Sequence, residues 1–554
     1  MKYKIIIALC IGYILWFTIQ PVETCWSETD IQLTVGIASL SVIGTAVMML
    51  RKQIIHFFKI DAVVCLWFSY VMLRAYCDTT YPCANFCLRS IQMFTLYLTA
   101  RLLFSSTHVS ERMLVIGILL CAGYEVIVGA DQLINGGSRH YLYALSGTFL
   151  NPGPYSAFLS MGLVMSYKLR KGYWLPAVFL ILLPATWSRA ALVSAAICLG
   201  IIYWNKWKQW KWQVAIGVTA IIVGLYFLKK GSADGRSIIY LISLLCIVQS
   251  PIWGSGIGSF CHQYAERMNS FYIQYPTFNF QSADVVEGAF NSLLQIGVEQ
   301  GLVGMSLAAT LIILLLIKLK EKGKVLRMGL LCLLIFSIFS YPFDLLPYQV
   351  IFVLIAAYAA SENKEAVPST KWYQLSRKFV VPITALICIL TLSFFLYCHI
   401  MERKKAESDY QMMAGLTYTD FVNDYYELFP YLRNNPRYLF DFGKMLAENG
   451  RYNDSNAMLH LGTLISNDPM FYVIQGNNYC KMGLHKEAEQ AYQKAFCIMP
   501  NRIYPLYRLM LLYKEKGDIA RMKDMAHKVI AFNVKVASPA TKEMQENAEN
   551  LLNK

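Results

Sequence analysis

The chain has 554 residues, of which 56% are hydrophobic, and its mean hydropathy is +0.41. This composition is typical of a polytopic membrane protein and excludes a soluble enzyme with a single apolar helix. The formal net charge of +15 would suit a nucleic-acid-binding protein. The basic residues, however, form short clusters between apolar runs, as in the loops that orient a membrane protein, so we exclude nucleic acid as a partner.

The sequence contains about thirteen apolar runs, each long enough to cross a bilayer as a helix. Their limits are 4–20, 31–50, 60–76, 88–104, 112–130, 153–168, 173–187, 189–204, 212–228, 292–317, 325–341, 346–360 and 378–399. The first run follows two lysines, as in a signal peptide, but it lacks a small-x-small cleavage site, so we predict a retained helix. We therefore expect an all-α fold, with a polytopic transmembrane helix bundle of about 12–13 spans followed by a soluble helical domain.

The loops between these runs differ in charge. Basic clusters all fall on one side if the spans alternate, and they are residues 51–52, 168–171, 206–211, 318–327 and 364–378. The opposite side receives segments that are acidic, cysteine-rich or long, namely 23–30, 77–87, 131–152 and 229–291. The positive-inside rule then predicts a cytoplasmic N-terminus and places the chain beyond Glu402 on the other side of the membrane.

Most of the fifteen cysteines lie in apolar runs, where they act as small hydrophobic side chains. Cys77, Cys83 and Cys87 instead cluster in one predicted external loop, with Cys25 on the same side. An oxidising compartment would allow a disulfide among them, and the sequence leaves the pairing open. Zinc binding is disfavoured because the loop contains no histidine.

Past Glu402 the sequence changes to a polar helical pattern with an internal repeat. Its key positions recur at spacings of 33 and 34 residues, in the series Gly443, Gly476, Met510 and the series Gly450, Gly483, Gly517. The pattern resembles the tetratricopeptide repeat, most clearly in residues 471–504. We expect residues 403–554 to form stacked antiparallel helix pairs, whose concave surface typically binds a protein or peptide. The alternative is a solvated cap that only stabilises the protein.

Two arginines stand where a membrane protein rarely tolerates a charge. Arg189 lies inside the apolar stretch 173–204, and Arg236 follows the apolar run 212–228. A guanidinium in hydrocarbon costs at least about 2.5 kcal/mol, so such residues usually face a cavity or a partner. Arginine also offers a planar fork that matches phosphate oxygens. The pair predicts a site for a lipid-linked phosphate, and snorkelling or pairing with a buried acid is the structural alternative.

Five motifs in chain order resemble the O-antigen ligase family, which includes O-antigen polymerases and protein O-oligosaccharyltransferases. They are Gly147–Pro152, Ser188–Ala190, Arg236 followed by Pro251–Gly256, Phe290–Gln295 and Glu299–Gly304. The resemblance covers roughly residues 60–360 of a membrane domain at 1–402, with a large external loop at 229–291. Glycines 254, 256 and 258 also offer backbone amides to a phosphate, although no Lys-Ser/Thr follows, which excludes a nucleotide-binding loop.

The resemblance implies a transferase in the bacterial inner membrane whose site faces the periplasm. It would move a glycan en bloc from undecaprenyl diphosphate to lipid A-core or to a protein. By position, Arg189 and Arg236 would bind the diphosphate, with Asn151 and Asn291 in support. Because guanidinium groups stabilise the charge on a departing diphosphate, we expect no metal ion and no cofactor. The repeat domain would lie in the periplasm, within reach of a protein partner.

One position departs from the family pattern. The family usually has a histidine, proposed to activate the acceptor hydroxyl, where this chain has Phe290. Glu287, His262 and Asp284 remain as candidate bases, and His140 ranks below them. We favour Glu287 because a helical turn would point it along the same face as Phe290. Loss of activity is the alternative.

The reaction itself stays open between a ligase and a polymerase, since both share these motifs. The external repeat array favours contact with a protein. A flippase or transporter of lipid-linked glycans would show inverted repeats or broken helices in both halves, and the sequence shows no such symmetry. A non-catalytic scaffold is favoured only by the missing histidine.

Overall fold

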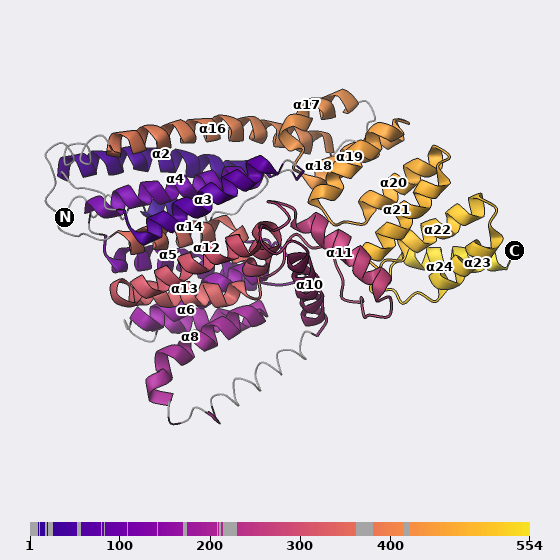
Figure 1. Cartoon of the computed structure of the whole chain (residues 1–554). Helices are drawn as coiled ribbons and strands as arrows, with labels where there is room; N and C mark the ends of the chain where they lie inside the picture. Colours follow the sequence, from indigo (N-terminus) through magenta and orange to yellow (C-terminus); the bar gives the residue numbers. More distant parts are fainter. Residues whose placement is uncertain are drawn as a thin grey trace.

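The computed structural model describes most of the chain and is helical throughout its regular elements. The described residues are 9, 11–16, 19, 26–51, 57–78, 80–81, 83–107, 109–140, 142–169, 174–207, 209, 212–213, 230–361, 381–414 and 421–553. Figure 1 shows a bundle of long helices on one side, an array of shorter helices on the other, and α11 between them. The all-α prediction is confirmed.

The bundle is built from the predicted apolar runs. Its helices are α2 (Trp26–Arg51), α3 (Lys59–Cys77), α4 (Ala84–Thr107), α5 (Glu111–Asn135), α6 (Pro152–Leu169), α7 (Trp174–Leu182), α8 (Arg189–Trp207), α12 (Ser292–Lys322), α13 (Lys324–Ser337), α14 (Leu346–Ala360) and α16 (Val381–Ala414). Within the described residues, α2, α3, α5, α12 and α16 each contain a stretch long and apolar enough to cross a membrane. The chain is a multi-pass membrane protein. The predicted span 4–20 is described only in part, and 212–228 lies outside the described residues except for its first two.

Helix α6 is buried along most of its length and packs against α5, α7, α8 and α13. Tyr155 and Phe158 are fully buried on it. A Cβ atom at Gly162 would lie 2.7 Å from the ring of Phe179 on α7. Only glycine therefore allows this close approach between α6 and the short α7. The chain continues from α7 toward α8.

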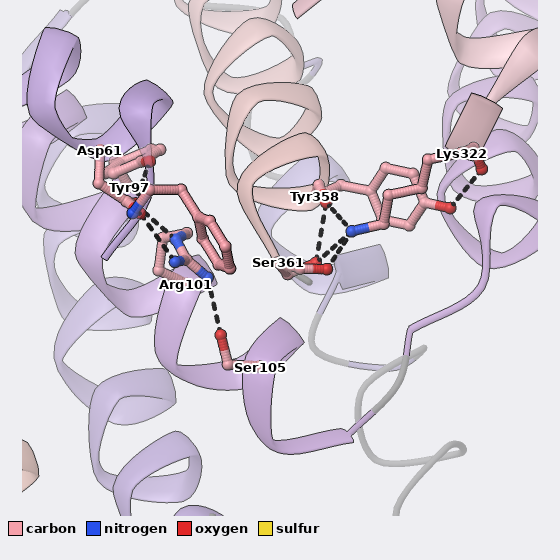
Figure 2. Close-up of polar contacts among 8 residues, drawn as sticks. Asp61, Tyr97, Arg101, Ser105, Lys322, Tyr358 and Ser361 are labelled. Atoms are coloured by element: carbon pink, nitrogen blue, oxygen red, sulfur yellow. Dashed lines mark hydrogen bonds and ion pairs between the residues drawn. The ribbon is translucent and has the colours of Figure 1, made fainter. Parts of the chain in front are cut away.

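The bundle also contains a charge that the sequence analysis did not single out, Arg101 on α4. Its Nε and Nη2 donate to the two carboxylate oxygens of Asp61 at 2.7 and 2.9 Å, and its Nη1 donates to Ser105 Oγ at 2.7 Å. Tyr97 donates a further hydrogen bond to Asp61 at 2.5 Å, as Figure 2 shows. Side-chain exposure is only 5% for Arg101 and 6% for Asp61. This arginine therefore follows the structural alternative, a buried acid as its partner.

A second polar contact ties the ends of α12 and α14. Lys322 Nζ donates to the backbone oxygens of Tyr358 and Ser361, and Tyr358 OH donates to Lys322 O at 3.0 Å (Figure 2). A cation on the last carbonyls of a helix complements its dipole. The contact satisfies carbonyls at the C-terminus of α14 that have no partner within the helix.

The predicted large loop at 229–291 contains two helices, which corrects the expectation of a loop. They are α10 (Lys230–Gln249) and α11 (Phe260–Gln274). Arg236 consequently lies inside α10 and not at the start of an irregular segment. The structure also shows the cysteines Cys77, Cys83 and Cys87 as free thiols, with the sulfur atoms of Cys83 and Cys87 3.8 Å apart. Cys25 lies outside the described residues.

The repeat array consists of helix pairs, as predicted. Its helices are α17 (Val422–Leu432), α18 (Pro436–Glu448), α19 (Tyr452–Ile465), α20 (Met470–Lys481), α21 (His485–Ile498), α22 (Tyr504–Glu515), α23 (Ile519–Ile530) and α24 (Pro539–Leu552). Added Cβ atoms at Gly443 and Gly476 would lie 2.7 and 2.5 Å from Leu459 and Tyr492 of the paired helix. The 33-residue period therefore marks the positions where two helices come closest.

A second glycine series lies in the turns that connect the paired helices. Gly450, Gly483 and Gly517 adopt φ of 74°, 74° and 72° between the two helices of successive pairs. This left-handed conformation strains any residue with a Cβ atom, so the turn requires glycine. The predicted boundary at Glu402 falls inside α16, because this membrane helix continues without a break to Ala414.

We expect removal of one member of the Asp61–Arg101 pair to destabilise the fold strongly. Asp61→Ala leaves a buried guanidinium without a counter-charge, which costs about 3–5 kcal/mol. Thermal unfolding of the detergent-solubilised protein measures this. The double variant Asp61→Ala, Arg101→Met removes both charges and should recover most of the loss. Equal melting temperatures for the single variant and the unchanged protein would contradict a structural role of the pair.

Candidate functional site

A cavity of about 520 Å³ brings together several of the residues that the sequence predicted for the site. Its walls come from the start of α6 with the residue before it, the turn before α8 with the first residues of α8, one face of α10, residues 282–286 and Phe290. The predicted residues among its lining are Arg189, Arg236, Asn151, Asp284 and Phe290. Segments that lie more than a hundred residues apart in the chain therefore meet at one cavity.

Arg189 reaches this cavity because the helical path breaks immediately before it. The short α7 leads into a 3-10 turn, η1 (Pro184–Thr186), and Trp187 then adopts a left-handed conformation with φ 52°. Arg189 is the first residue of α8. Irregular backbone at membrane depth is tolerated where it lines a cavity. The break thus turns the guanidinium of Arg189 toward polar surroundings and away from hydrocarbon.

Arg236 approaches the same cavity from α10. Its guanidinium carbon lies 5.8 Å from the ring centroid of Phe290, and that ring meets Tyr341 edge-on at 5.2 Å. Burial lowers the pKa of Arg236; the phenol of Tyr240 opposes this effect, and the like charge of Arg189 adds to it. Both burial and the charge of Arg189 thus disfavour the charged form of Arg236, and a bound anion would offset this effect.

Phe290 has a structural role that its position in the family pattern did not indicate. Its φ of 49° is unusual for a residue with a large side chain. Tyr240 on α10 donates hydrogen bonds to Phe290 O at 3.2 Å and to Ile338 O at 2.7 Å. The strained backbone is thus held from α10, and the ring provides an aromatic face for the cation of Arg236.

Asn151 is placed by polar residues of α5. The Glu125 carboxylate accepts hydrogen bonds from Thr148 N at 3.1 Å and from Thr148 Oγ1 at 2.6 Å. Gln132 Oε1 accepts from Gly147 N at 2.9 Å, and its Nε2 donates to Gly147 O at 2.8 Å. The first motif is thereby fastened to a membrane helix. The sequence analysis missed Glu125 and Gln132, although a carboxylate within the apolar run 112–130 was a usable signal.

The glycine-rich segment 251–258 does not offer its central amides to a phosphate, so that expectation is wrong. Ser255 N donates to Val298 O at 2.8 Å and Gly256 N to Glu299 O at 3.1 Å. In a regular helix these two carbonyls would accept from Leu302 and Val303. Those two amides instead donate to Pro251 O at 2.8 Å and Ile252 O at 3.2 Å. The segment thus exchanges hydrogen bonds with a broken helix.

The break in α12 occurs at Gly301, whose φ of 63° and ψ of −163° are not helical. A Cβ atom at Gly301 would lie 2.4 Å from Gly254 N, and one at Gly254 would lie 2.5 Å from Gln300 N. Glycine is required on both sides for the two backbones to approach so closely. The second and fifth motifs therefore each mark an interrupted membrane helix, although the sequence shows no symmetry between the two halves.

The remaining candidate bases lie in different surroundings. Asp284 lines the cavity, and its carboxylate lies 3.4 Å from Lys535 and 3.6 Å from Arg502. Glu287 is exposed and does not line the cavity, although Val286 and Phe290 on either side of it do. Residues 283–291 contain no helix. Glu287 therefore does not share a helical face with Phe290, contrary to the prediction, because the backbone there is irregular.

The two histidines and Asn291 also have local partners. His262 Nδ1 lies 3.0 Å from Thr463 O, in contact with the repeat array. His140 Nδ1 accepts a hydrogen bond from Leu142 N at 3.1 Å, and neither histidine lines the cavity. Asn291 is the N-cap of α12, and its side chain accepts from the amides of residues 293 and 294. Asn291 thus supports the site through the start of α12.

The cavity also has lining residues that the sequence analysis did not identify, among them Tyr143, Ser282 and Lys535. Lys535 belongs to the repeat array, between α23 and α24. No sequence signal could have found it, because its position depends on how the array packs against the bundle.

Comparison with known proteins agrees with the sequence motifs. Residues 175–309 match the family model described as O-antigen ligase, and this range contains both arginines and both helix breaks. The family resemblance is thereby confirmed. No match was found among curated proteins. Among solved structures, the crystal structure of the APC/C hetero-tetramer Cut9-Hcn1 aligns with 94% of this chain and 90% of that chain, at 11% identity and a TM-score of 0.23. A similarity this low carries no argument.

Proposed function

Because the chain carries an O-antigen ligase domain, we propose that it transfers an oligo- or polysaccharide en bloc from undecaprenyl diphosphate to an acceptor. The acceptor is lipid A-core or a protein, and the reaction takes place at the periplasmic face of the inner membrane. The observation that carries this proposal is the convergence of Arg189 and Arg236 on one cavity within the matched region.

The two arginines suit a diphosphate better than a neutral ligand. Among the described residues Arg236 makes a cation–π contact and no ion pair, and the charge of Arg189 acts on it. Guanidinium groups bind phosphate oxygens through two parallel N–H donors. When the bond between the sugar and the phosphate breaks, the diphosphate gains negative charge, and the arginines stabilise that charge without having to move.

The acceptor hydroxyl needs a group that removes its proton, and we assign this role to Glu287. Its side chain is exposed on the segment between two cavity-lining residues, Val286 and Phe290. In the described part of the chain no ion pair engages its carboxylate. Asp284, by contrast, already contacts two cations, Lys535 and Arg502. His262 remains the second candidate, with its Nδ1 toward Thr463 O.

A polymerase would use the same cavity, so the lipid-linked glycans of a deletion strain test the reaction. A ligase is needed only for the final transfer, and its loss should leave full-length chains on the lipid carrier. Loss of a polymerase should leave single repeat units. Full-length chains, separated by gel electrophoresis of the lipid-linked fraction, are the expected result, and single units would overturn the ligase assignment.

Substitution of either arginine should lower transfer strongly. Arg189→Lys keeps the charge but loses the two-donor fork, and Arg236→Ala removes the charge. We expect each to reduce glycan transfer about 10²–10³-fold, the cost of losing one preorganised charge-stabilising donor. Glycan attached to the acceptor, at equal membrane levels of the protein, is the measurement.

Arg112→Lys is the matched control for these two variants. Arg112 is an exposed arginine in the first turn of α5, away from the cavity, and its substitution should leave transfer unchanged. Near-normal transfer by Arg189→Lys and Arg236→Ala would refute the diphosphate site.

Glu287→Gln should slow the chemical step, because the amide keeps the shape of the side chain but cannot take a proton. The expected loss is about 10²–10⁴-fold, the usual contribution of a positioned base. Donor binding should survive, since the arginines bind the diphosphate. His262→Ala is the comparison and should have the smaller effect. Full activity of Glu287→Gln together with an inactive His262→Ala would assign the base to His262.

A further inference from the structure

A short irregular segment, residues 281–286, forms part of the cavity wall, and we call it the strap. Ser282, Ala283, Asp284, Val285 and Val286 of the strap all line the cavity. The strap lies directly on α10, where a Cβ atom at Gly235 would be 3.0 Å from Ser282 O. Gly235 immediately precedes Arg236, so the strap forms the wall next to the proposed diphosphate site.

The strap is hydrogen-bonded to the repeat array at both of its ends. Asn501 Nδ2 donates to Gln281 O at 3.1 Å and to Ala283 O at 2.7 Å. The amide of Val286 donates to Asn467 Oδ1 at 3.1 Å. Asn501 and Asn467 are only 6% and 1% exposed. Irregular backbone at a buried place needs such partners, so the array determines where this wall of the cavity stands.

Further contacts fix the array to the helix that precedes the strap. Lys494 lies 2.6 Å from Glu266 of α11, and Phe496 meets Tyr272 edge-on at 5.6 Å. Ala265 of α11 is buried in the apolar core of the array. Figure 1 shows α11 between the bundle and the array, and α16 extends from the bundle to the array, where Tyr410 packs against Tyr425 of α17 and Tyr438 of α18. The array is therefore a fixed part of the cavity and not a tethered module.

One charged side chain of the array enters the cavity itself. Lys535 Nζ donates to Ala283 O at 3.3 Å and lies 3.4 Å from Asp284 Oδ2. The side chains of Lys535 and Asp284 are 40% and 58% exposed. An ion pair this exposed contributes little to stability, and both groups remain accessible to a ligand. Arg502 also contacts Asp284, at 3.6 Å, but does not line the cavity.

We propose that Lys535 and Asp284, with Ser282 beside them, form a subsite for the sugar that adjoins the diphosphate of the donor. A carboxylate accepts hydrogen bonds from sugar hydroxyls, an ammonium group donates to them, and a serine hydroxyl does both. The repeat array thus contributes directly to donor recognition. This inference rests on the proposed function, since it places the sugar in the same cavity as the arginines.

Two lipid probes distinguish binding through the sugar from binding through the phosphates. One is undecaprenyl diphosphate without a sugar, and the other is the lipid-linked glycan fraction extracted from cells that make this protein. Binding of each to the full chain in lipid nanodiscs gives the dissociation constants. We expect Lys535→Ala to weaken binding of the glycan-bearing lipid about tenfold, the cost of a lost hydrogen bond to a charged group. Binding of the bare lipid should not change.

Asp284→Asn keeps the size of the side chain and should also weaken only the binding of the glycan-bearing lipid. Arg502→Ala is the matched control, because Arg502 pairs with the same carboxylate from outside the cavity, and it should change neither constant. Equal weakening by Lys535→Ala and Arg502→Ala would show that the pair only fastens the array. If Lys535→Ala loses binding of the bare lipid, Lys535 is a phosphate ligand. If Lys535→Ala leaves the dissociation constants of both lipids unchanged, the sugar does not contact Lys535. Each of these results overturns the subsite.

The proposed function has a separate indicator in the same experiment. Arg236→Ala should weaken the binding of both lipids, because both carry the diphosphate. If Arg236→Ala binds both as the unchanged chain does, the diphosphate site is wrong. If Arg236→Ala behaves as expected and Lys535→Ala binds normally, only the sugar subsite is wrong.

Discussion

An arginine on a membrane helix is costly unless its guanidinium meets a partner or a polar cavity, and this chain meets the requirement in two ways. Arg101 has a buried carboxylate, Asp61, and two hydroxyl-bearing neighbours, so its charge is neutralised within the bundle. Arg189 and Arg236 instead converge on a cavity. The rest of the membrane domain can be understood from this difference, because one arrangement stabilises the fold and the other brings two positive charges to one cavity.

The convergence depends on backbone that leaves the helical path. The path breaks before Arg189, and α12 breaks at Gly301, where residues 251–256 exchange hydrogen bonds with it. Since unpaired backbone groups are costly in a membrane, each break needs its own compensation. Glu125 and Gln132 perform a similar task for the segment that leads to Asn151. The motifs in this chain are thus largely residues that make irregular backbone possible within the membrane domain.

The repeat array also provides hydrogen-bond partners for irregular backbone, in this case the backbone of the strap. Asn467 and Asn501 are buried because they hold the strap, whose backbone has no helix to pair with. An array that typically binds proteins on its concave surface here also completes the wall of a cavity. Under the proposed function, an acceptor protein bound to the array would lie beside the donor.

Local patterns in the sequence determined the elements of this protein. Apolar runs specified the membrane helices, and the 33-residue period specified the helix pairs, because Gly443 and Gly476 mark close approaches and Gly450 and Gly483 mark left-handed turns. Arg189 and Arg236 stood out because charge is rare in apolar surroundings. Only the tertiary structure decided that Arg101 pairs with Asp61, that glycines 254 and 256 serve α12, that Glu287 is not on a helix, and that Lys535 reaches the cavity. These facts depend on contacts between residues far apart in the chain, and no local spacing records which distant side chain packing will bring to a given place.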